Sequence, residues 1–375
     1  MRSMSRGRVL LTMVALLALV AAGCGDDDDD DEASTATTEA SDTETTEGAD
    51  GSESEPAATE AEGAGAAELV AAATEEGGCT IYSSQGLDAL NAFAEAFESE
   101  YDGIDVEVVR GIDTELSSRV ETEHETGGGA DMFVSASQSW VEDHAEQGWF
   151  LEPVGPQLTG EGDYDADQYV HEGNHFEVGA AVLTFAWNTG AFEAGLESYE
   201  DLLDPGLSGG KIGVIEPAAP SIVDFYLWLE ENFGEEYVEG LAAQEPRIYP
   251  SSLPMGEALI AGEIFAASFG APAQLEPAKA SGAPIDYAID PVGAWGARYF
   301  GMLLDSGDNP NCAQLLGDFM VTAEGQELVV GVAASILPDI PGTLLTNEDV
   351  REQDLSKLTP EAVSAYQEKW NSLFR

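Results

Sequence analysis

The feature that most constrains the fold is a repeated order of strand, polar loop and helix that begins at Cys79. Short β-branched runs alternate with longer segments whose apolar residues recur at helical spacing, as Leu90, Phe93 and Phe97 do. The expected strands cover residues 79–82, 104–109 and 130–134, and the expected helices cover 87–101, 113–125 and 140–147. This order predicts an α/β fold with a mostly parallel sheet.

Polar turns follow two of these strands, at residues 83–86 and 135–139. In parallel sheets, ligands bind at the carboxyl ends of the strands, where the helices that follow present free backbone N–H groups. We therefore expect a shared ligand site, which would contain Ser83, Ser84, Gln85, Ser135 and Ser137. The alternative is that the serines only cap the helices that follow them.

The stretch Phe176–Thr189 is apolar and rich in β-branched and aromatic residues, which predicts a strand buried on both faces. A second block of strands and helices follows it and opens at Lys211. We interpret Phe176–Thr189 as a segment that crosses between two lobes, with the ligand site in the cleft between them. The alternative is an ordinary core strand of a single α/β domain.

In the second block, the expected strands cover residues 211–215, 247–249 and 264–269, and 285–289 and 292–303 would lead the chain back to the first lobe. By the strand-end rule, the residues expected to face the cleft are Glu216, Tyr249, Ser251, Ser252 and Phe269. Tyr249 and Phe269 could instead belong to the lobe's core. The tail after Pro338 is expected to form a helix on the first lobe.

The N-terminus has the pattern of a secretory signal, with basic Arg2, Arg6 and Arg8 before an apolar run over 9–20 that is too short to span a membrane comfortably. The residues Ala21-Ala22-Gly23-Cys24 resemble a bacterial lipobox, although Ala21 stands where leucine is usual. The resemblance implies cleavage before Cys24 and a diacylglycerol on its thiol. The alternative is plain secretion with an incidental cysteine.

The segment after Cys24 is acidic and contains no basic residue up to about Gly65, so it cannot bury enough apolar surface to fold. We expect a disordered tether over 24–67 and a short helix over 68–76. The whole chain carries 13 basic and 72 acidic residues, a formal net charge of −59. Such a charge argues against nucleic-acid binding.

Cys79 and Cys312 remain as a possible pair, and outside the cytoplasm two thiols tend to be oxidised. Cys79 precedes the first core strand and Cys312 lies in a late helix, so either a disulfide or two unpaired buried thiols is compatible with the sequence. No CxxC motif or Cys/His metal spacing is present in the sequence.

Several motifs, in this order, resemble the extracellular solute-binding proteins of bacterial ABC importers, and their iron(III)-type members in particular. They are TIYSSQG, GADMFVSAS, QGWFLEP, FAWNTG, LLDPGLSGGKIGVIEP, MGEALIAGEIFAA and CAQLLGDFMVTAEGQELV. The resemblance implies two Rossmann-like lobes joined by crossing hinge strands, the type II periplasmic-binding-protein fold. It further implies a monomer without enzymatic activity or cofactor, which takes a small-molecule or ion ligand to a membrane permease.

The expected organisation is a signal peptide over 1–23, the lipidated tether over 24–67, a first lobe from 68–177 plus 291–375, and a second lobe from 178–290. The protein would then be lipid-anchored on the outer face of the cell membrane, or in a periplasm.

The ligand stays open at this stage. Ferric members of the family carry adjacent tyrosines where this chain has Phe269-Gly270-Ala271-Pro272, so iron is doubtful. Hydroxyl-rich turns suit an oxyanion, a phosphorylated compound or a metal chelate, whereas Glu216 and the acidic surroundings would favour a cation such as a polyamine. An arginine in the cleft would point to an anion, and the candidates are Arg110, Arg119, Arg247 and Arg298.

Two other functions can be formulated. The residues His171-Glu172-Gly173-Asn174-His175 match the H-E-x-x-H pattern of zinc metallopeptidases, which needs both histidines on one helical face. Gly173 and Asn174 are poor helix formers, and on an extended chain residues four apart lie roughly 13 Å from each other. The remaining alternative is a surface lipoprotein that binds no ligand.

Overall fold

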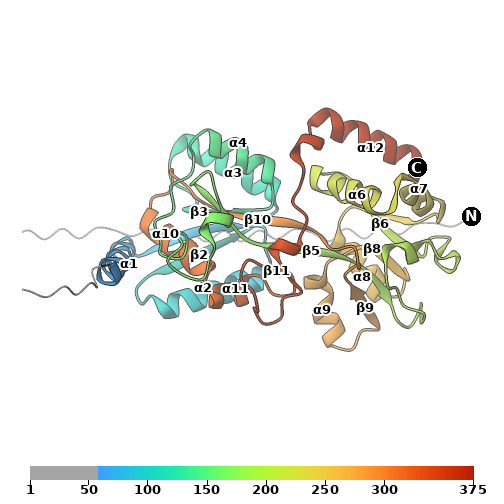
Figure 1. Ribbon diagram of the computed structural model, residues 1–375, viewed down its shortest axis with the longest axis horizontal. Coiled ribbons are helices and arrows are strands. Elements are labelled where there is room, and N and C mark those ends of the chain that lie inside the picture. The colour runs from blue at the N-terminus through green and yellow to red at the C-terminus, as the bar shows by residue number, and fades with distance from the viewer. Residues whose placement is uncertain (1–57) are drawn as a thin grey trace, which may run out of the picture. The chain divides into compact units, whose positions relative to one another are not determined.

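One long strand, β5 (His175–Asn188), belongs to two sheets at once. In the computed structural model, which describes residues 58–375, its first part pairs antiparallel with β10 (Trp295–Leu303). Its last part pairs antiparallel with β8 (Ala266–Gly270) and β9 (Ile285–Ala288). Figure 1 shows β5 and β10 running between two groups of helices and strands. The predicted crossing strand is confirmed, and it begins and ends one residue earlier than expected.

The first lobe is built on the strand order β2-β1-β3-β10-β5, in which β1 pairs parallel with both of its neighbours. Its strands are β1 (Gly78–Ser83), β2 (Asp105–Arg110), β3 (Met132–Ser135), β4 (Val170–His171), β11 (Ala334–Ser335) and β12 (Leu345–Thr346). Its helices are α1 (Ala58–Glu76), α2 (Leu87–Glu100), α3 (Asp113–Thr126), α4 (Gln138–Glu146), α5 (Ala166–Tyr169), α10 (Pro310–Met320) and α11 (Ala323–Val329).

The second lobe continues the path from β5 through β8 to β6 (Ile212–Ile215) and β7 (Arg247–Tyr249), and β6 is parallel to both neighbours. Its helices are α6 (Pro220–Phe233), α7 (Glu235–Ala243), α8 (Ser252–Ile260), α9 (Pro272–Ala280) and α12 (Pro360–Phe374). Short 3-10 helices cover Tyr199–Leu203, Pro205–Leu207, Asn347–Asp349 and Leu355–Lys357. Antiparallel β5 and β10 make the whole a mixed sheet rather than the mostly parallel one expected.

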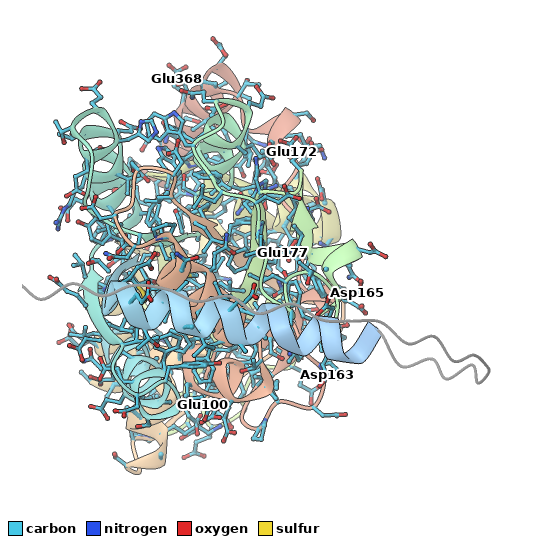
Figure 2. The ribbon with its side chains drawn as sticks, turned by 90° about the vertical axis from the view of Figure 1, so that its left-hand side faces the viewer. Glu100, Asp163, Asp165, Glu172, Glu177 and Glu368 are labelled. Atoms are coloured by element: carbon cyan, nitrogen blue, oxygen red, sulfur yellow. A yellow bond between two sulfur atoms is a disulfide. The ribbon has the colours of Figure 1, made fainter. Side chains whose placement is uncertain are left out.

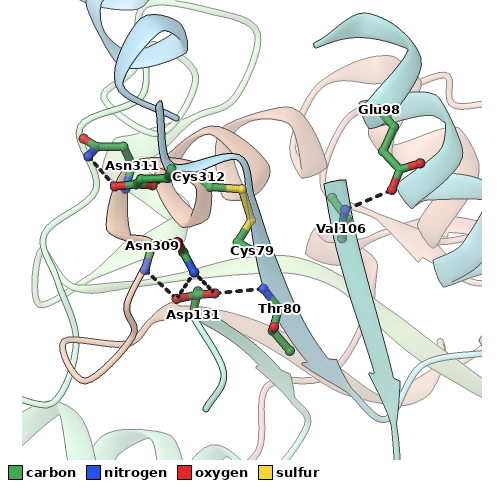
Figure 3. The surroundings of a disulfide bond; sticks show 9 residues. Cys79, Thr80, Glu98, Val106, Asp131, Asn309, Asn311 and Cys312 are labelled. Carbon is green, nitrogen blue, oxygen red and sulfur yellow. Dashed lines mark hydrogen bonds between the residues drawn. A yellow bond between two sulfur atoms is a disulfide. The ribbon is translucent and has the colours of Figure 1, made fainter. Parts of the chain in front are cut away.

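A disulfide holds the first lobe together. Cys79 on β1 and Cys312 on α10 are joined with a Cα–Cα distance of 5.7 Å (Figure 3). Beside it, the buried Asp131 carboxylate accepts hydrogen bonds from the backbone N–H groups of Thr80 and Asn309, at 2.8 Å each. The disulfide and this carboxylate fasten the late helix α10 to the start of the sheet.

The second lobe is held by aromatic packing. Phe225 on α6 contacts Phe269 edge to face at a centroid distance of 4.8 Å, and Trp295 at 5.5 Å. Helix α12 packs on α6, where Trp370 and Tyr366 are part of the second lobe's core. The expectation that the C-terminal helix covers the first lobe is therefore wrong, because its apolar face meets Tyr226 on α6.

The structure tests only part of what the sequence predicts for the N-terminal region. The signal peptide, Cys24 and most of the tether lie outside the described residues. Helix α1 begins at Ala58, so the last ten residues of the expected tether, 58–67, are helical, and the helix is longer than the predicted 68–76. Within the described residues, no helix is both long and apolar enough to cross a membrane.

The surface of the described part is strongly acidic. Figure 2 labels Glu100, Asp163, Asp165 and Glu172, all of them exposed, around the face that α1 crosses. The described residues present few cations to balance such acids. This distribution agrees with the net charge of −59.

Candidate functional site

A cleft of about 540 Å³ lies where the two lobes meet at β5 and β10. Its first wall comes from the starts of α3 and α4, and its second wall from the starts of α6, α8 and α9. The lining residues of the first wall are Ile112, Asp113, Thr114, Ala136, Ser137, Gln138 and Ser139. Those of the second wall are Ala219, Pro220, Ser221, Ile222, Ser252, Phe269, Ala271 and Gln274. The floor and the chain segment after 350 add Ala181, Leu183, Ala297, Tyr299, Gln353, Leu355 and Leu358.

On the first wall, one carboxylate joins the two serine-containing turns. Asp113 Oδ1 accepts hydrogen bonds from Ser84 Oγ at 3.0 Å, from Ser135 Oγ at 2.7 Å and from the backbone N–H of Ala136 at 3.2 Å. The turns after β1 and β3 are therefore neighbours, as the strand-end rule requires. Their two hydroxyl protons, however, point at Asp113, so Ser84 and Ser135 act on the cleft through that carboxylate.

On the second wall three helices start without a side-chain cap, as α3 and α4 do on the first wall, but no carboxylate lies among the residues of the second wall. The residues before α6, α8 and α9 are Ala219, Ser251 and Ala271, and none of their side chains accepts a hydrogen bond from the helix that follows. By contrast, the side chains of Thr322 and Thr359 cap α11 and α12. Uncapped helix starts carry free N–H donors and a partial positive charge, both of which favour an acceptor or an anion.

The floor of the cleft is largely apolar, with one hydroxyl. Leu183 and Phe269 line it beside Tyr299 of β10. Burial, and then the negative charge of nearby Asp113, raises the pKa of Tyr299 to about 12. The phenol therefore keeps its proton at neutral pH and can act as a neutral donor. A smaller pocket of about 90 Å³ adjoins the floor and shares Ala181 and Tyr299 with it.

The predicted site residues are spread unevenly over this geometry. Three of them line the cleft itself, namely Ser137, Ser252 and Phe269. Gln85 lines the adjoining small pocket, and Ser252 Oγ donates to Gln274 Oε1 across the second wall at 3.1 Å.

Besides Ser84, Ser135 and Gln85, four more predicted residues do not line the cleft. Ser83 is fully buried and donates to Gln85 Oε1, so its hydroxyl is already used. Glu216 lies in a separate hollow next to α12 and pairs with Arg375 at 2.7 Å. Tyr249 lies on β7, the edge strand of its sheet, and packs against the core of the second lobe. Ser251 precedes α8 and is exposed outside the lining.

Asp113 is the main residue that the sequence reading missed. It follows β2 by three positions and begins α3, so the strand-end rule applied to that strand would have found it. Gln353, Leu355 and Leu358 carry no such signal, because they line the cleft only through the way the chain crosses to the second lobe after residue 350.

None of the four candidate arginines lines the cleft. Arg298 is held below the hinge by Glu177, at 2.9 Å, and by the backbone oxygen of Val350. Burial alone would raise the pKa of Glu177, but the hydrogen bond with His171 and the charge of Arg298 outweigh it, so that pKa is lowered. Arg119 pairs with Glu123 and Arg247 with Glu263, and Arg110 donates to the backbone oxygen of Gln85. The sequence criterion for a side-chain anion site is therefore not met.

A second charged group, on the side of the second lobe, connects the crossing segments. Arg351 forms ion pairs with the buried Asp224 and with Glu231, and Trp295 Nε1 donates to Asp224 at 2.7 Å. These contacts tie β10 and the third crossing segment to α6.

The H-E-x-x-H residues form a hairpin rather than a helix. His171 on β4 is the cross-strand neighbour of His175 on β5, and Glu172 and Gly173 form the turn with φ values of 51° and 73°. Burial, and then the charge of His171, lowers the pKa of His175 to about 4. Among the described residues, no three His, Cys, Asp or Glu side chains are placed to hold a metal ion. The geometry therefore does not favour the metallopeptidase.

The chain resembles several solved binding proteins in fold. A substrate-binding protein of an ABC transporter from Agrobacterium tumefaciens aligns with a TM-score of 0.67 at 14% identity, over 80% of this chain and 94% of that chain. Iron-bound HitA of Pseudomonas aeruginosa aligns with a TM-score of 0.61 at 18% identity, over 79% and 99%. AfuA of Actinobacillus pleuropneumoniae, with fructose-6-phosphate bound, gives 0.61 at 19% identity, over 79% and 98%.

Curated protein sequences offer no match to the chain. A family match does exist, because residues 79–330 fit the family described as bacterial extracellular solute-binding protein. These residues make up more than half of the chain and contain both walls of the cleft up to residue 330. The resemblance inferred from the sequence motifs is thereby confirmed, and the chain belongs to the bacterial extracellular solute-binding proteins.

Proposed function

We propose that this protein captures a small polar organic solute in the cleft between its lobes and delivers it to the permease of an ABC importer. The two lobes would close on the solute by bending at β5, β10 and the segment after residue 350. The observation that carries this proposal is the cleft itself, about 540 Å³ in volume and lined by helix starts from both lobes. A surface protein without a ligand would need no such cleft.

The second wall supports a solute with an anionic or acceptor group, such as a carboxylate or a phosphate. Pro220 and Pro272, which begin α6 and α9, have no N–H. The donors at the uncapped starts of α6, α8 and α9 are therefore the backbone N–H groups of Ser221, Ser252, Leu253 and Ala273, which can act without any basic side chain. This description narrows the oxyanion and phosphorylated classes expected from the sequence. Iron bound as in a ferric protein has no support, because Phe269 and Ala271 line the cleft where a tyrosine pair would be needed.

We further propose that the signal peptide over 1–23 directs export and that Cys24 carries the lipid anchor. The acidic segment that follows Cys24 would then act as a tether, and the binding domain would act as a monomer. The lipobox-like residues around Cys24 support the anchor. Cys24→Ala is expected to release the protein from the membrane fraction of the producing cell, and retention of the variant there would contradict the anchor.

The capture function is tested by a thermal-shift screen of the purified chain against phosphate esters, amino acids, polyamines and ferric citrate. A solute present at 100 times its dissociation constant should add about 2.7 kcal/mol to the free energy of unfolding. Small-angle scattering should then record a smaller radius of gyration with the solute than without it.

A steric block supplies the control for the site. Ala297 lines the floor, so Ala297→Trp should fill the cleft and abolish the shift. Ala71→Trp, on the exposed surface of α1, should leave the shift unchanged. A screen without any stabilising solute, or a solute that still stabilises Ala297→Trp, would overturn the proposal.

A further inference from the structure

Asp113 is the one charged side chain among the described residues that line the cleft. It lies on the first wall, opposite the uncapped helix starts of the second. We propose that the solute is a zwitterion, with a cationic nitrogen held by Asp113 and an acceptor group held by the second lobe. This inference rests on the proposed function and names the chemical class of its solute.

The way in which Asp113 is held leaves one oxygen for a ligand. All three of its hydrogen bonds, from Ser84, Ser135 and Ala136, end on Oδ1. No hydrogen bond to Oδ2 exists within the described part of the chain, although the residue lines the cleft. An ionised carboxylate can only accept hydrogen bonds, so the group that meets Oδ2 must be a donor. The three donors fix the carboxylate in place before the solute arrives.

The negative charge of Asp113 further favours a donor that carries a positive charge. Like charges a few ångströms apart repel and opposite charges attract, and both effects are stronger near a protein surface than in water. The carboxylate of Asp113 therefore disfavours an anion beside it and favours a cation. No basic side chain lines the cleft. Arg110, which donates to the backbone oxygen of Gln85, keeps its positive charge near enough to oppose the rise in the pKa of Tyr299, but Asp113 is the charge that a solute in the cleft meets directly.

The two walls of the cleft therefore favour groups of opposite charge. A carboxylate or phosphate fits the starts of α6, α8 and α9, and an ammonium, guanidinium or similar nitrogen fits Asp113. The apolar Leu183 and Phe269 between them suit the uncharged middle of such a molecule. A solute with both charges can place its cation on Asp113 and its acceptor group on the second wall, and contacts with both lobes favour the closed state.

The test is a thermal-shift screen of the purified chain against solutes sorted by charge. Glycerol 3-phosphate and citrate represent anions, choline and spermidine represent cations, and phosphocholine and amino acids represent zwitterions. The strongest stabilisers are expected to be zwitterions. Stabilisation mainly by anions without a cationic group would overturn the inference while leaving solute capture intact. Stabilisation mainly by pure cations would overturn the acceptor end, and no stabilisation at all would count against capture itself.

The role of Asp113 is then tested by calorimetric titration of the best zwitterion. Asp113→Asn should weaken its binding at least ten-fold, because Asn retains an acceptor oxygen but loses the charge. Glu368→Gln, exposed on α12 and ten residues beyond the last cleft-lining residue Leu358, should leave the affinity unchanged. Unchanged or tighter binding by Asp113→Asn would overturn the inference. If Asp113→Asn does not fold, the inference is still tested by the charge class of the solutes that stabilise the wild-type chain.

Discussion

In the first lobe, α3 and α4 begin at the cleft. The carboxylate of Asp113, at the start of α3, accepts hydrogen bonds from the hydroxyls of Ser84 and Ser135. In the second lobe, α6, α8 and α9 begin at the same cleft without a side-chain cap, as α3 and α4 do, but no carboxylate lies among the residues of that wall. The first wall thus offers a fixed negative charge and the second offers backbone donors. Two lobes of similar architecture can therefore select opposite ends of one solute.

The lobes also differ in what keeps them folded. The first lobe has the Cys79–Cys312 disulfide and the buried Asp131, which ties β1 to α10. In the second lobe, α12 completes an aromatic core that includes Tyr226 and Trp370. One lobe relies on a covalent bond between distant segments, and the other on a helix supplied from the end of the chain. Mutations can therefore weaken either lobe separately.

The largest effect is expected in the second lobe, from Trp370→Ala. The indole is 1% exposed, stacks on Phe374 at 4.4 Å and contacts Tyr226 at 6.0 Å. Its loss should lower the free energy of unfolding by about 3–5 kcal/mol, the usual cost of removing a buried aromatic side chain. Urea unfolding followed by circular dichroism measures this. Ser364→Ala, exposed on the same helix, should change it by less than about 0.5 kcal/mol. A cost below about 1 kcal/mol would show that α12 does not support the second lobe.

The position of α12 also shows what a sequence pattern can and cannot reveal. The apolar spacing of α12 identifies a helix that must bury one face. The pattern does not reveal which element that face packs against. The strands β1 to β3 and the helices α2 to α4 were predicted within about two residues because each is specified by local periodicity, whereas α1 begins ten residues earlier than predicted. The crossing strand was equally visible, since β5 is apolar over nearly its whole length.

The cleft was less predictable for the same reason. Ser137, Ser252 and Phe269 follow strands and could be found by a rule about strand ends. The hydroxyls of Ser84 and Ser135 were read as ligand groups, but their direction is decided by Asp113, a contact between segments far apart in sequence. Glu216 was misplaced because its partner, Arg375, comes from the far end of the chain.

The next effect concerns the first lobe. Replacing both Cys79 and Cys312 by alanine should lower the free energy of unfolding by about 2–5 kcal/mol. The bridge joins residues separated by 233 positions, so its removal frees a long closed loop in the unfolded chain. Denaturant titration measures the loss, and reduction of the wild-type chain should reproduce it. Within the described residues, the second lobe has no disulfide. Removal of the bridge should therefore change the fluorescence of Trp228, in the second lobe, less than the signal of a probe in the first lobe. Equal stability with and without the bridge would remove this difference between the lobes.

A smaller effect depends on pH and comes from Asp318 on α10. Burial raises the pKa of this carboxyl from 3.8 to about 6, although the N–H groups of Leu158 and Gln157 partly oppose the rise. The folded state therefore binds the proton more tightly than the unfolded state. The stability this gives is complete below about pH 3.8 and is lost as pH rises through about 6. At about 1.36 kcal/mol per pKa unit, the loss is about 3 kcal/mol.

Asp318→Asn should remove this dependence, because its amide oxygen can still accept from Gln157 and Leu158 but does not ionise. The variant should match the wild type near pH 4 and exceed its unfolding free energy near pH 7. Asp88→Asn, exposed on α2, is the control and should leave the pH profile unchanged. Parallel pH profiles for Asp318→Asn and the wild type would contradict the assignment.

The smallest expected effect compares one serine from each wall. Ser135 is fully buried, and its hydroxyl donates to the charged Asp113 at 2.7 Å, so Ser135→Ala should cost about 1.5–3 kcal/mol. Ser252 donates to the neutral Gln274 at an exposed position, so Ser252→Ala should cost no more than about 0.5 kcal/mol. Urea unfolding of both variants gives the stability difference. Solute titration should show the same order, because the first variant loosens the carboxylate and the second leaves the helix starts intact. Equal costs for the two variants would mean that Asp113 is not held in place by the turns, and the contrast between the walls would then rest on the uncapped helices alone.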